Sequence, residues 1–263
     1  MYKGLYTAYT GLANEQNRMD VLTNNLANAS TVGYKKEGAT SQAFDSILSY
    51  KIKDTSEAPN IARRMGTVNL GVKIGENYTD FTQGSFRITG NTYDLALAGN
   101  GFFTVQFTNK AGEESIKYTR DGSFTLNRQG YLVTADDDYV LGEGNRRIRL
   151  DPLAEATIDE TGTIYQNGVS VATLRITDFE DYDYLEKYGE NYYEPIRDAN
   201  GRTTRTIDAD AAVKSGYLEM ANVQVVSEMV NMIAITRAYE SNQKIIQTYD
   251  DTLDNAVNQI GRI

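Results

Sequence analysis

The chain has 263 residues, of which 40% are hydrophobic and 24% charged, so its length allows one large domain or two smaller ones. It contains no Cys, His or Trp, which excludes disulfides, thiolate or imidazole metal ligands, and Ser–His or Cys–His catalysis. A net charge of −10 (26 basic against 36 acidic residues) argues against nucleic acid as a partner, because binding phosphates needs clustered Lys and Arg. No run of 18 apolar residues and no apolar signal-peptide core occurs, so the sequence predicts no membrane insertion. No motif for a cofactor or a metal stands out, and none is predicted.

Residues 1–34 predict a long N-terminal helix ended by Gly33. Its apolar residues follow a heptad pattern typical of a coiled-coil seam. The seam positions are Leu5, Ala8, Leu12, Met19, Leu22, Leu26 and Ala29, with Glu15 as the one polar interruption. With so narrow an apolar stripe, the isolated helix is expected to be only marginally stable in water, because helices gain most of their stability from packing. Asn24, Asn25 and Asn28 are either solvated surface or amides that fix the register of neighbouring subunits. Gly33-Tyr34 is either a helix stop with a buried aromatic or a subunit contact.

Residues 35–75 predict an extended connector, with a short helix near 44–50. Residues 76–215 predict a central antiparallel β domain, because short β-rich runs alternate with turn dipeptides such as Asn167-Gly168. The segments 118–126 and 163–176 are interpreted as hairpins, and Gly99-Asn100-Gly101 as a turn between strands. The fold class is therefore α+β, with a sandwich or partly open barrel between two terminal helices.

Residues 216–263 predict a second long helix, free of Pro and of Gly between 217 and 260. Its heptad seam changes phase once, which alters a supercoil locally without ending it. The seam positions are Val223, Val226, Val230, Ile233, Tyr239, Ile246, Tyr249, Leu253 and Ile260. From periodicity alone, both terminal seams fit an intramolecular core, a coiled-coil zipper or an assembly interface.

Four segments resemble the flagellar hook–basal body axial protein family. NNLANASTVGYKKEGATSQAF (24–44) is similar to its N-terminal signature, and LEMANVQVVSEMVNMIAITRAYESN (218–242) to its C-terminal signature. Residues 91–105 and 118–142 are similar to its central β segments. Length and the unbroken middle most resemble a basal-body rod protein, the distal rod subunit first and the proximal one second.

The resemblance implies a non-enzymatic structural subunit that polymerises head-to-tail into a helical tube. The tube would transmit torque from motor to hook and enclose the export channel. Implied partners are other copies of the chain, other rod and hook proteins, and the flagellar type III export apparatus, which would explain the missing apolar leader. The expected location is the basal body in the cell envelope, and the seams, the Asn cluster and Gly33-Tyr34 become candidate subunit contacts in a coiled-coil inner layer.

Two other functions remain open on the sequence. The stretch 178–194 holds seven Asp or Glu against one Lys, interleaved with five Tyr. It suggests a solvated surface insertion, or the contact patch of a secreted adhesin or carbohydrate-binding protein. A pair of carboxylates in a peptidoglycan-cutting enzyme is the third reading. Asp136, Asp137 and Asp138 lack calcium-loop spacing and are interpreted as a polar turn.

Overall fold

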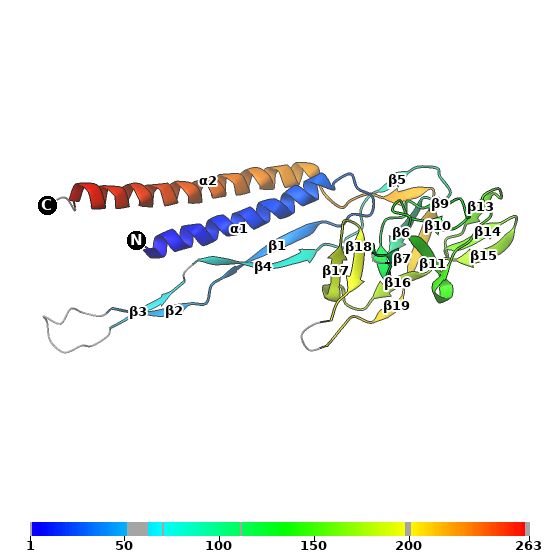
Figure 1. Ribbon diagram of the computed structural model, residues 1–263, viewed down its shortest axis with the longest axis horizontal. Coiled ribbons are helices and arrows are strands. Elements are labelled where there is room, and N and C mark those ends of the chain that lie inside the picture. Colours follow the sequence, from blue (N-terminus) through cyan, green and yellow to red (C-terminus); the bar gives the residue numbers. More distant parts are fainter. Residues whose placement is uncertain (1, 52–62, 70, 111, 198–200, 261–263) are drawn as a thin grey trace. The chain divides into compact units, whose positions relative to one another are not determined.

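The computed structural model describes residues 2–51, 63–69, 71–110, 112–197 and 201–260. The chain divides into two compact units, each built from separate stretches of sequence (Figure 1). Unit 1 comprises residues 1–26, 37–79 and 225–263, and unit 2 comprises residues 27–36 and 80–224. The chain therefore passes between the units four times.

Unit 1 contains the two long helices. Helix α1 spans Tyr2–Ala27 and α2 spans Val225–Asn255, followed by the π-helical turn η3 at Ala256–Ile260. Both predicted terminal helices are present, but α2 begins nine residues after the expected 216. The intervening Tyr217–Glu219 forms strand β21 instead, because it pairs with β5 and buries Leu218 and Glu219.

The described residues between 37 and 79, which separate the two stretches of unit 2 in the sequence, form an arm of paired strands in unit 1 (Figure 1). Strand β1 (Glu37–Ala43) pairs antiparallel with β4 (Val72–Thr79). Strand β2 (Ile47–Lys51) pairs with β3 (Arg63–Val68). The short helix expected near 44–50 is wrong, since residues 47–51 are committed to this cross-strand pairing.

Unit 2 is the β domain, and its registered strand pairs are all antiparallel. Its largest sheet has the order β17-β18-β8-β7-β11-β10-β9, with β12 on β11 and β16 joining β7 to β19. Three smaller sheets are β13-β14-β15, β20-β6 and β21-β5. The bounds are β5 Phe86–Ile88, β6 Leu95–Gly99, β7 Phe102–Thr108, β8 Glu114–Thr119, β9 Thr125–Leu126, β10 Leu132–Val133, β11 Tyr139–Gly142, η1 Glu143–Asn145, β12 Arg146–Arg147, β13 Ala156–Ile158, β14 Thr163–Gln166, β15 Val169–Thr173, β16 Ile176–Phe179, η2 Tyr182–Tyr184, β17 Leu185–Tyr188, β18 Tyr192–Pro195, β19 Thr206–Asp208, β20 Ala211–Ser215 and β21 Tyr217–Glu219.

Two buried clusters lie on opposite faces of β7, because successive side chains of a strand point to opposite faces. Phe103 belongs to the larger, mostly aliphatic cluster, which includes Leu95, Leu132 and Ile164. Phe102 belongs to an aromatic cluster with Tyr118, Phe179, Leu185 and Tyr193. The β domain therefore has its own core.

The predicted hairpin at 163–176 is confirmed. Asn167 and Gly168 both adopt positive φ (51° and 79°), as a two-residue turn between β14 and β15 requires. The predicted hairpin at 118–126 is wrong, since β9 pairs with β10 and not with β8. There the chain turns towards β6 instead, where the Leu95 amide donates to the Gly122 carbonyl at 2.9 Å. The expected turn at 99–101 links β6 to β7.

Candidate functional site

The two helices of unit 1 run antiparallel (Figure 1), and two glycines of α1 lie against side chains of α2. Gly4 lies against the Tyr249 ring, and Gly11 lies against the Asn242 side chain. Positions 4 and 11 are one heptad apart, as are 249 and 242, so the two contacts share one register. Gly4 and Gly11 are outside the predicted seam, so α1 meets α2 through its smallest residues.

The predicted seam of α1 flanks this contact, and its member Ala8 is buried (5% exposed). Its members Leu5, Leu12, Met19, Leu22 and Leu26 all keep part of their surface exposed.

The face of α1 adjacent to these glycines is tied to the arm by polar side chains. Asn25 is fully buried, and its amide forms two hydrogen bonds with the backbone of Glu37, at 2.7 Å to the carbonyl and 2.9 Å from the N–H. The Asn14 amide donates to Ser41 Oγ at 3.0 Å. Asn25 thus positions α1 on β1, while Asn24 is exposed and Asn28 half-buried.

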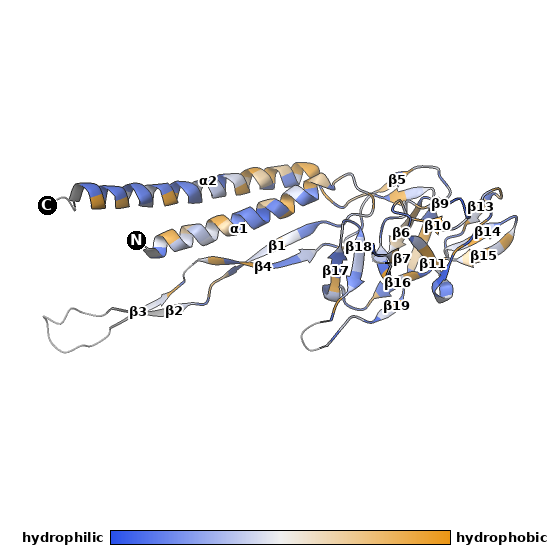
Figure 2. Cartoon of the chain, in the orientation of Figure 1, coloured by the Kyte–Doolittle hydropathy of each residue, from blue (hydrophilic) through white to orange (hydrophobic). Residues whose placement is uncertain are grey.

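Helix α2 leaves most of its apolar residues exposed. Among its described side chains, only Glu228 and Ile235 are buried. An exposed row, here called the α2 stripe, occupies its first turns, where Figure 2 shows the apolar residues of the helix concentrated. The stripe consists of Val226 (76% exposed), Met229 (50%), Val230 (60%) and Ile233 (54%).

The α2 stripe points away from α1. At about 100° per residue, Ile235 and Asn242 lie about 180° and 160° around the helix from Val226. Asn242 contacts α1 and Ile235 is buried. Helix α1 therefore does not cover the stripe.

The rest of the predicted C-terminal seam is distributed differently. Val223 precedes the helix and is half-buried in unit 2, whereas Tyr239, Ile246, Tyr249 and Leu253 are half-buried on α2. Ile260 ends η3, and its side chain lies outside the described residues.

Gly33 and Tyr34 lie inside unit 2. Gly33 has φ +69° and approaches the backbone of Arg120 and Asp121 so closely that a β-carbon would overlap it. The Tyr34 side chain is fully buried. Both residues therefore support the fold of unit 2.

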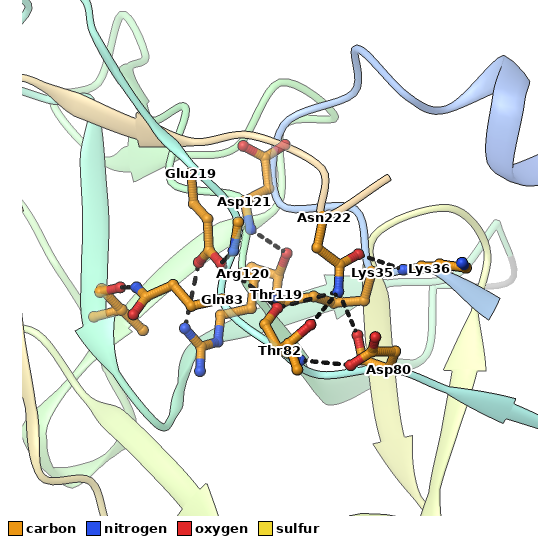
Figure 3. A network of polar contacts seen from close by, with 12 residues as sticks. Lys35, Lys36, Asp80, Thr82, Gln83, Thr119, Arg120, Asp121, Glu219 and Asn222 are labelled. Carbon is orange, nitrogen blue, oxygen red and sulfur yellow. Dashed lines mark hydrogen bonds and ion pairs between the residues drawn. The ribbon is translucent and has the colours of Figure 1, made fainter. Parts of the chain in front are cut away.

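A buried polar network beside Tyr34 joins distant parts of unit 2 (Figure 3). The Glu219 carboxylate is fully buried and accepts from Lys35 Nζ at 2.6 Å and from Arg120 Nη1 at 3.3 Å. The Gly84 N–H also donates to this carboxylate, at 2.9 Å. Burial lowers the pKa of the Lys35 ammonium, and the charge of Glu219 opposes that shift. The guanidinium of Arg120 also lies 5.3 Å from the Phe102 ring centroid.

Asn222 extends this network. Its carbonyl oxygen accepts from the Lys36 N–H at 2.7 Å, and its NH₂ donates to Asp80 O at 2.8 Å and Thr82 O at 3.1 Å. Sequence reasoning missed Lys35, Arg120, Glu219 and Asn222, because charged and amide residues far apart in sequence carry no periodic signal. All four fall within segments that resemble the family, but that resemblance assigned no role to these individual side chains.

The acidic, Tyr-rich stretch 178–194 is part of the fold of unit 2. Tyr193 is fully buried in the aromatic cluster, and Tyr182 and Tyr192 donate to Asp178 and Asp138 at 2.6 and 2.8 Å. The reading of this stretch as a solvated insertion is therefore wrong for these tyrosines.

Asp136–Asp138 form the turn between β10 and β11, with Asp137 at φ +68°. Burial raises the pKa of Asp138, while the hydrogen bond from Tyr192 lowers it. Within the described residues, no three acidic side chains cluster as metal ligands. None of the described helices has the length and apolar character needed to cross a membrane.

Three family descriptions match the chain. Residues 5–35 match "Flagella basal body rod protein", 96–166 match "Flagellar hook protein FlgE/F/G D1 domain", and 214–260 match "Flagellar basal body rod FlgEFG protein C-terminal". The flagellar hook-basal body complex protein FlhO of Bacillus subtilis is 33% identical over the whole of both chains.

Two further relatives cover almost the full length. The flagellar basal-body rod protein FlgG of Bacillus subtilis is 32% identical over 98% of this chain and 99% of that protein. The flagellar basal-body rod protein FlgF of Caulobacter vibrioides is 34% identical over 97% of this chain and 98% of that protein.

Proposed function

Since the chain belongs to the flagellar basal-body rod family, whose members are structural proteins and not enzymes, we propose that it polymerises head-to-tail into the helical tube of the rod. It works in the flagellar basal body, assembled with other rod and hook proteins. Relatives named FlgG and FlgF have similar identity to the chain, so the proposal concerns the rod as a whole.

The α2 stripe is the observation that carries the proposal. Four large apolar side chains, each at least half exposed, follow one another along a single helix face. Each contributes about 1.5–3 kcal/mol when fully buried. Such a row on a soluble protein marks an interaction surface, and α1 of the same subunit faces the other side of α2.

The proposed occupant of the stripe is a second copy of the chain. The half-buried seam of α1, from Leu5 to Leu26, offers apolar surface at heptad spacing, which suits packing of one helix against another. Identical contacts that do not close into a ring repeat as an open helix, which produces a tube. In this arrangement the terminal helices form a coiled-coil layer around the export channel and the β domains lie outside it.

Two further parts of the proposal follow from the tube. A stiff tube of identical subunits transmits torque from motor to hook without any chemical step. The subunits reach it through the flagellar type III export apparatus as unfolded chains. Little of α2 is buried within the subunit, which suits a chain whose helices complete their packing only at the site of assembly.

The test is a charge placed on the stripe. Val230→Asp puts a carboxylate where a neighbouring subunit must bury it, which is costly. Asn231→Asp is the matched control, because it adds the same charge at an exposed position about 100° away around the helix.

Sedimentation and electron microscopy of purified protein measure the concentration at which tubes appear. Val230→Asp should raise this concentration about tenfold or more, equivalent to about 1.4 kcal/mol or more per contact, while Asn231→Asp leaves it near the wild-type value. Equal polymerisation of Val230→Asp and wild type would refute the stripe as the contact.

A further inference from the structure

Next to three of the four points where the chain crosses between the units, unit 2 contains a short group of residues. These three groups are hydrogen-bonded to one another. Apart from the crossing at 26/27, the crossings fall at 36/37, 79/80 and 224/225. Within unit 2, Lys35 and Lys36 precede the first, Asp80 and Thr82 follow the second, and Glu219 and Asn222 precede the third. These are the residues of the buried network in Figure 3.

Side chains of the third group bind the other two. Glu219 holds Lys35 through the 2.6 Å ion pair and holds the Gly84 N–H at 2.9 Å. Asn222 binds the Lys36 N–H and the carbonyls of Asp80 and Thr82. The first and second groups are also joined directly, by Lys35 Nζ to Thr82 O and by the Asp80 N–H to Lys36 O, both at 2.8 Å.

Backbone hydrogen bonds reinforce the same junction. The Gly33 N–H donates to the Glu219 carbonyl at 2.8 Å, and the Met220 N–H donates to the Ser85 carbonyl at 2.8 Å. Arg120, at the end of β8, provides the second cation for Glu219 and so connects the junction to the main sheet.

We propose that Glu219 and Asn222 form a clasp that fastens the three exit segments of unit 2 to one another, so that load reaching unit 2 along any one of them is shared among all three. The load-bearing part rests on the proposed rod function. Without the clasp, force on any one exit would peel that segment from the edge of unit 2. With it, force on one exit is shared by all three and by β8.

Burial makes the loss of the central carboxylate of the clasp costly. Glu219 is fully buried, and its cations Lys35 and Arg120 are 1% and 3% exposed, so losing the Glu219 charge leaves two buried cations without this counter-ion. Breaking such a pair from one side is strongly destabilising, whereas exposed pairs contribute little. Unit 2 also offers a matched exposed pair, Arg147 and Glu114, at 2.7 Å with side chains 37% and 54% exposed.

Amide hydrogen exchange on the full-length monomer tests the clasp without requiring polymerisation. Glu219→Gln keeps the side-chain size but removes the charge. It should speed exchange roughly 100-fold at the Gly33, Asp80 and Met220 amides, none of which bonds to the altered side chain. The Leu132 and Leu174 amides, hydrogen-bonded within the main body of unit 2, should exchange as in wild type.

Two variants complete the design. Asn222→Ala removes the half-buried side-chain amide and should speed exchange of the Asp80 amide. It still tests the clasp if the Glu219→Gln variant fails to fold. Arg147→Met breaks the exposed pair and should change none of these amides. Unchanged exchange at Gly33, Asp80 and Met220 would overturn the clasp, as would an equal acceleration at Leu132 and Leu174, because the network would then contribute only to global stability.

The mechanical consequence is measured on the polymer. Tubes of Asn222→Ala should form at the wild-type concentration, since the α2 stripe is intact, but show a several-fold shorter persistence length in electron micrographs. Wild-type stiffness would overturn the load-bearing role of the clasp. If wild-type protein forms no tubes, the proposed rod function fails, while the exchange result still decides whether the clasp exists.

Discussion

Gly4 of α1 lies so close to the Tyr249 ring of α2 that a side chain at position 4 would overlap the ring. The overlapping atoms are at the far end of the Tyr249 side chain, so we expect Gly4→Leu to push the ring aside and loosen this contact, even though leucine favours helix over glycine by about 1 kcal/mol. Overpacking costs about 1–3 kcal/mol, and rotation of the ring keeps the loss near the lower end of that range. Circular dichroism and denaturant unfolding should show reduced stability of unit 1.

The control for this prediction is Lys3→Leu, which adds the same side chain at an exposed neighbouring position. Tyr249→Ala should restore the stability of Gly4→Leu, because it removes the group that the leucine meets. If the double variant is no more stable than Gly4→Leu, the contact does not exist as described.

The helices were predictable from sequence, and Tyr249 was among the predicted seam positions, but the residues of α1 that meet α2 were not predicted. Heptad spacing of Leu5, Leu12 and Met19 predicted α1 correctly because an amphipathic period is a local property. The contact with α2 instead uses Gly4 and Gly11, whose value lies in having no side chain, and hydropathy gives such positions no weight.

The β domain shows the same distinction between local and distant signals. Asn167-Gly168 fixes its turn through its own backbone preferences, so that hairpin was predictable. Asp121-Gly122 has similar local preferences, but a hydrogen bond to Leu95 redirects the chain. Strand β21 and the Lys35–Glu219 pair likewise depend on partners far away in sequence, at separations that no local pattern encodes.

A second prediction concerns Asn25, whose side-chain amide hydrogen-bonds to both the N–H and the C=O of Glu37, as the backbone of a neighbouring strand would. Asn25→Ala removes two part-buried hydrogen bonds to the backbone of Glu37, each worth about 0.5–1.5 kcal/mol, so the free energy of unfolding should fall by about 1–3 kcal/mol. Gln16→Ala, at an exposed position of the same helix, should cost less than about 0.5 kcal/mol. Urea unfolding of the monomer measures both, and equal midpoints for the two variants would contradict the role of Asn25.

A third prediction concerns the helices before assembly. Only Ile235 among the described apolar side chains of α2 is buried, so packing within the subunit stabilises this helix weakly. In dilute monomer, amides of residues 1–30 and 225–260 should exchange orders of magnitude faster than the amides of Val105 or Leu132, and become protected in tubes. Slow exchange of both helices in a verified monomer would show that they need no neighbour.

The tyrosines of the acidic stretch predict how unit 2 responds to alkali. Burial raises the pKa of Tyr182 and of Tyr192 well above the usual 10. The hydrogen bonds that these hydroxyls donate to Asp178 and Asp138 raise the pKa further. Each group then favours the folded state below pH 10, where both states hold the proton. That contribution is lost as the pH rises from 10 through the folded pKa, because the unfolded chain releases its protons first.

Unit 2 should therefore become less stable above pH 10, by at most about 1.4 kcal/mol per pH unit for each such tyrosine. Tyr182→Phe removes one titrating group, so the drop in the free energy of unfolding between pH 9 and pH 11 should shrink by up to about 1.4 kcal/mol. This holds although losing the 2.6 Å bond to Asp178 lowers stability at pH 9. Tyr188→Phe, at an exposed ring of β17, is the control and should keep the wild-type drop. An equal drop in Tyr182→Phe and wild type would mean that the Tyr182 hydroxyl ionises as readily in the folded protein as in the unfolded chain.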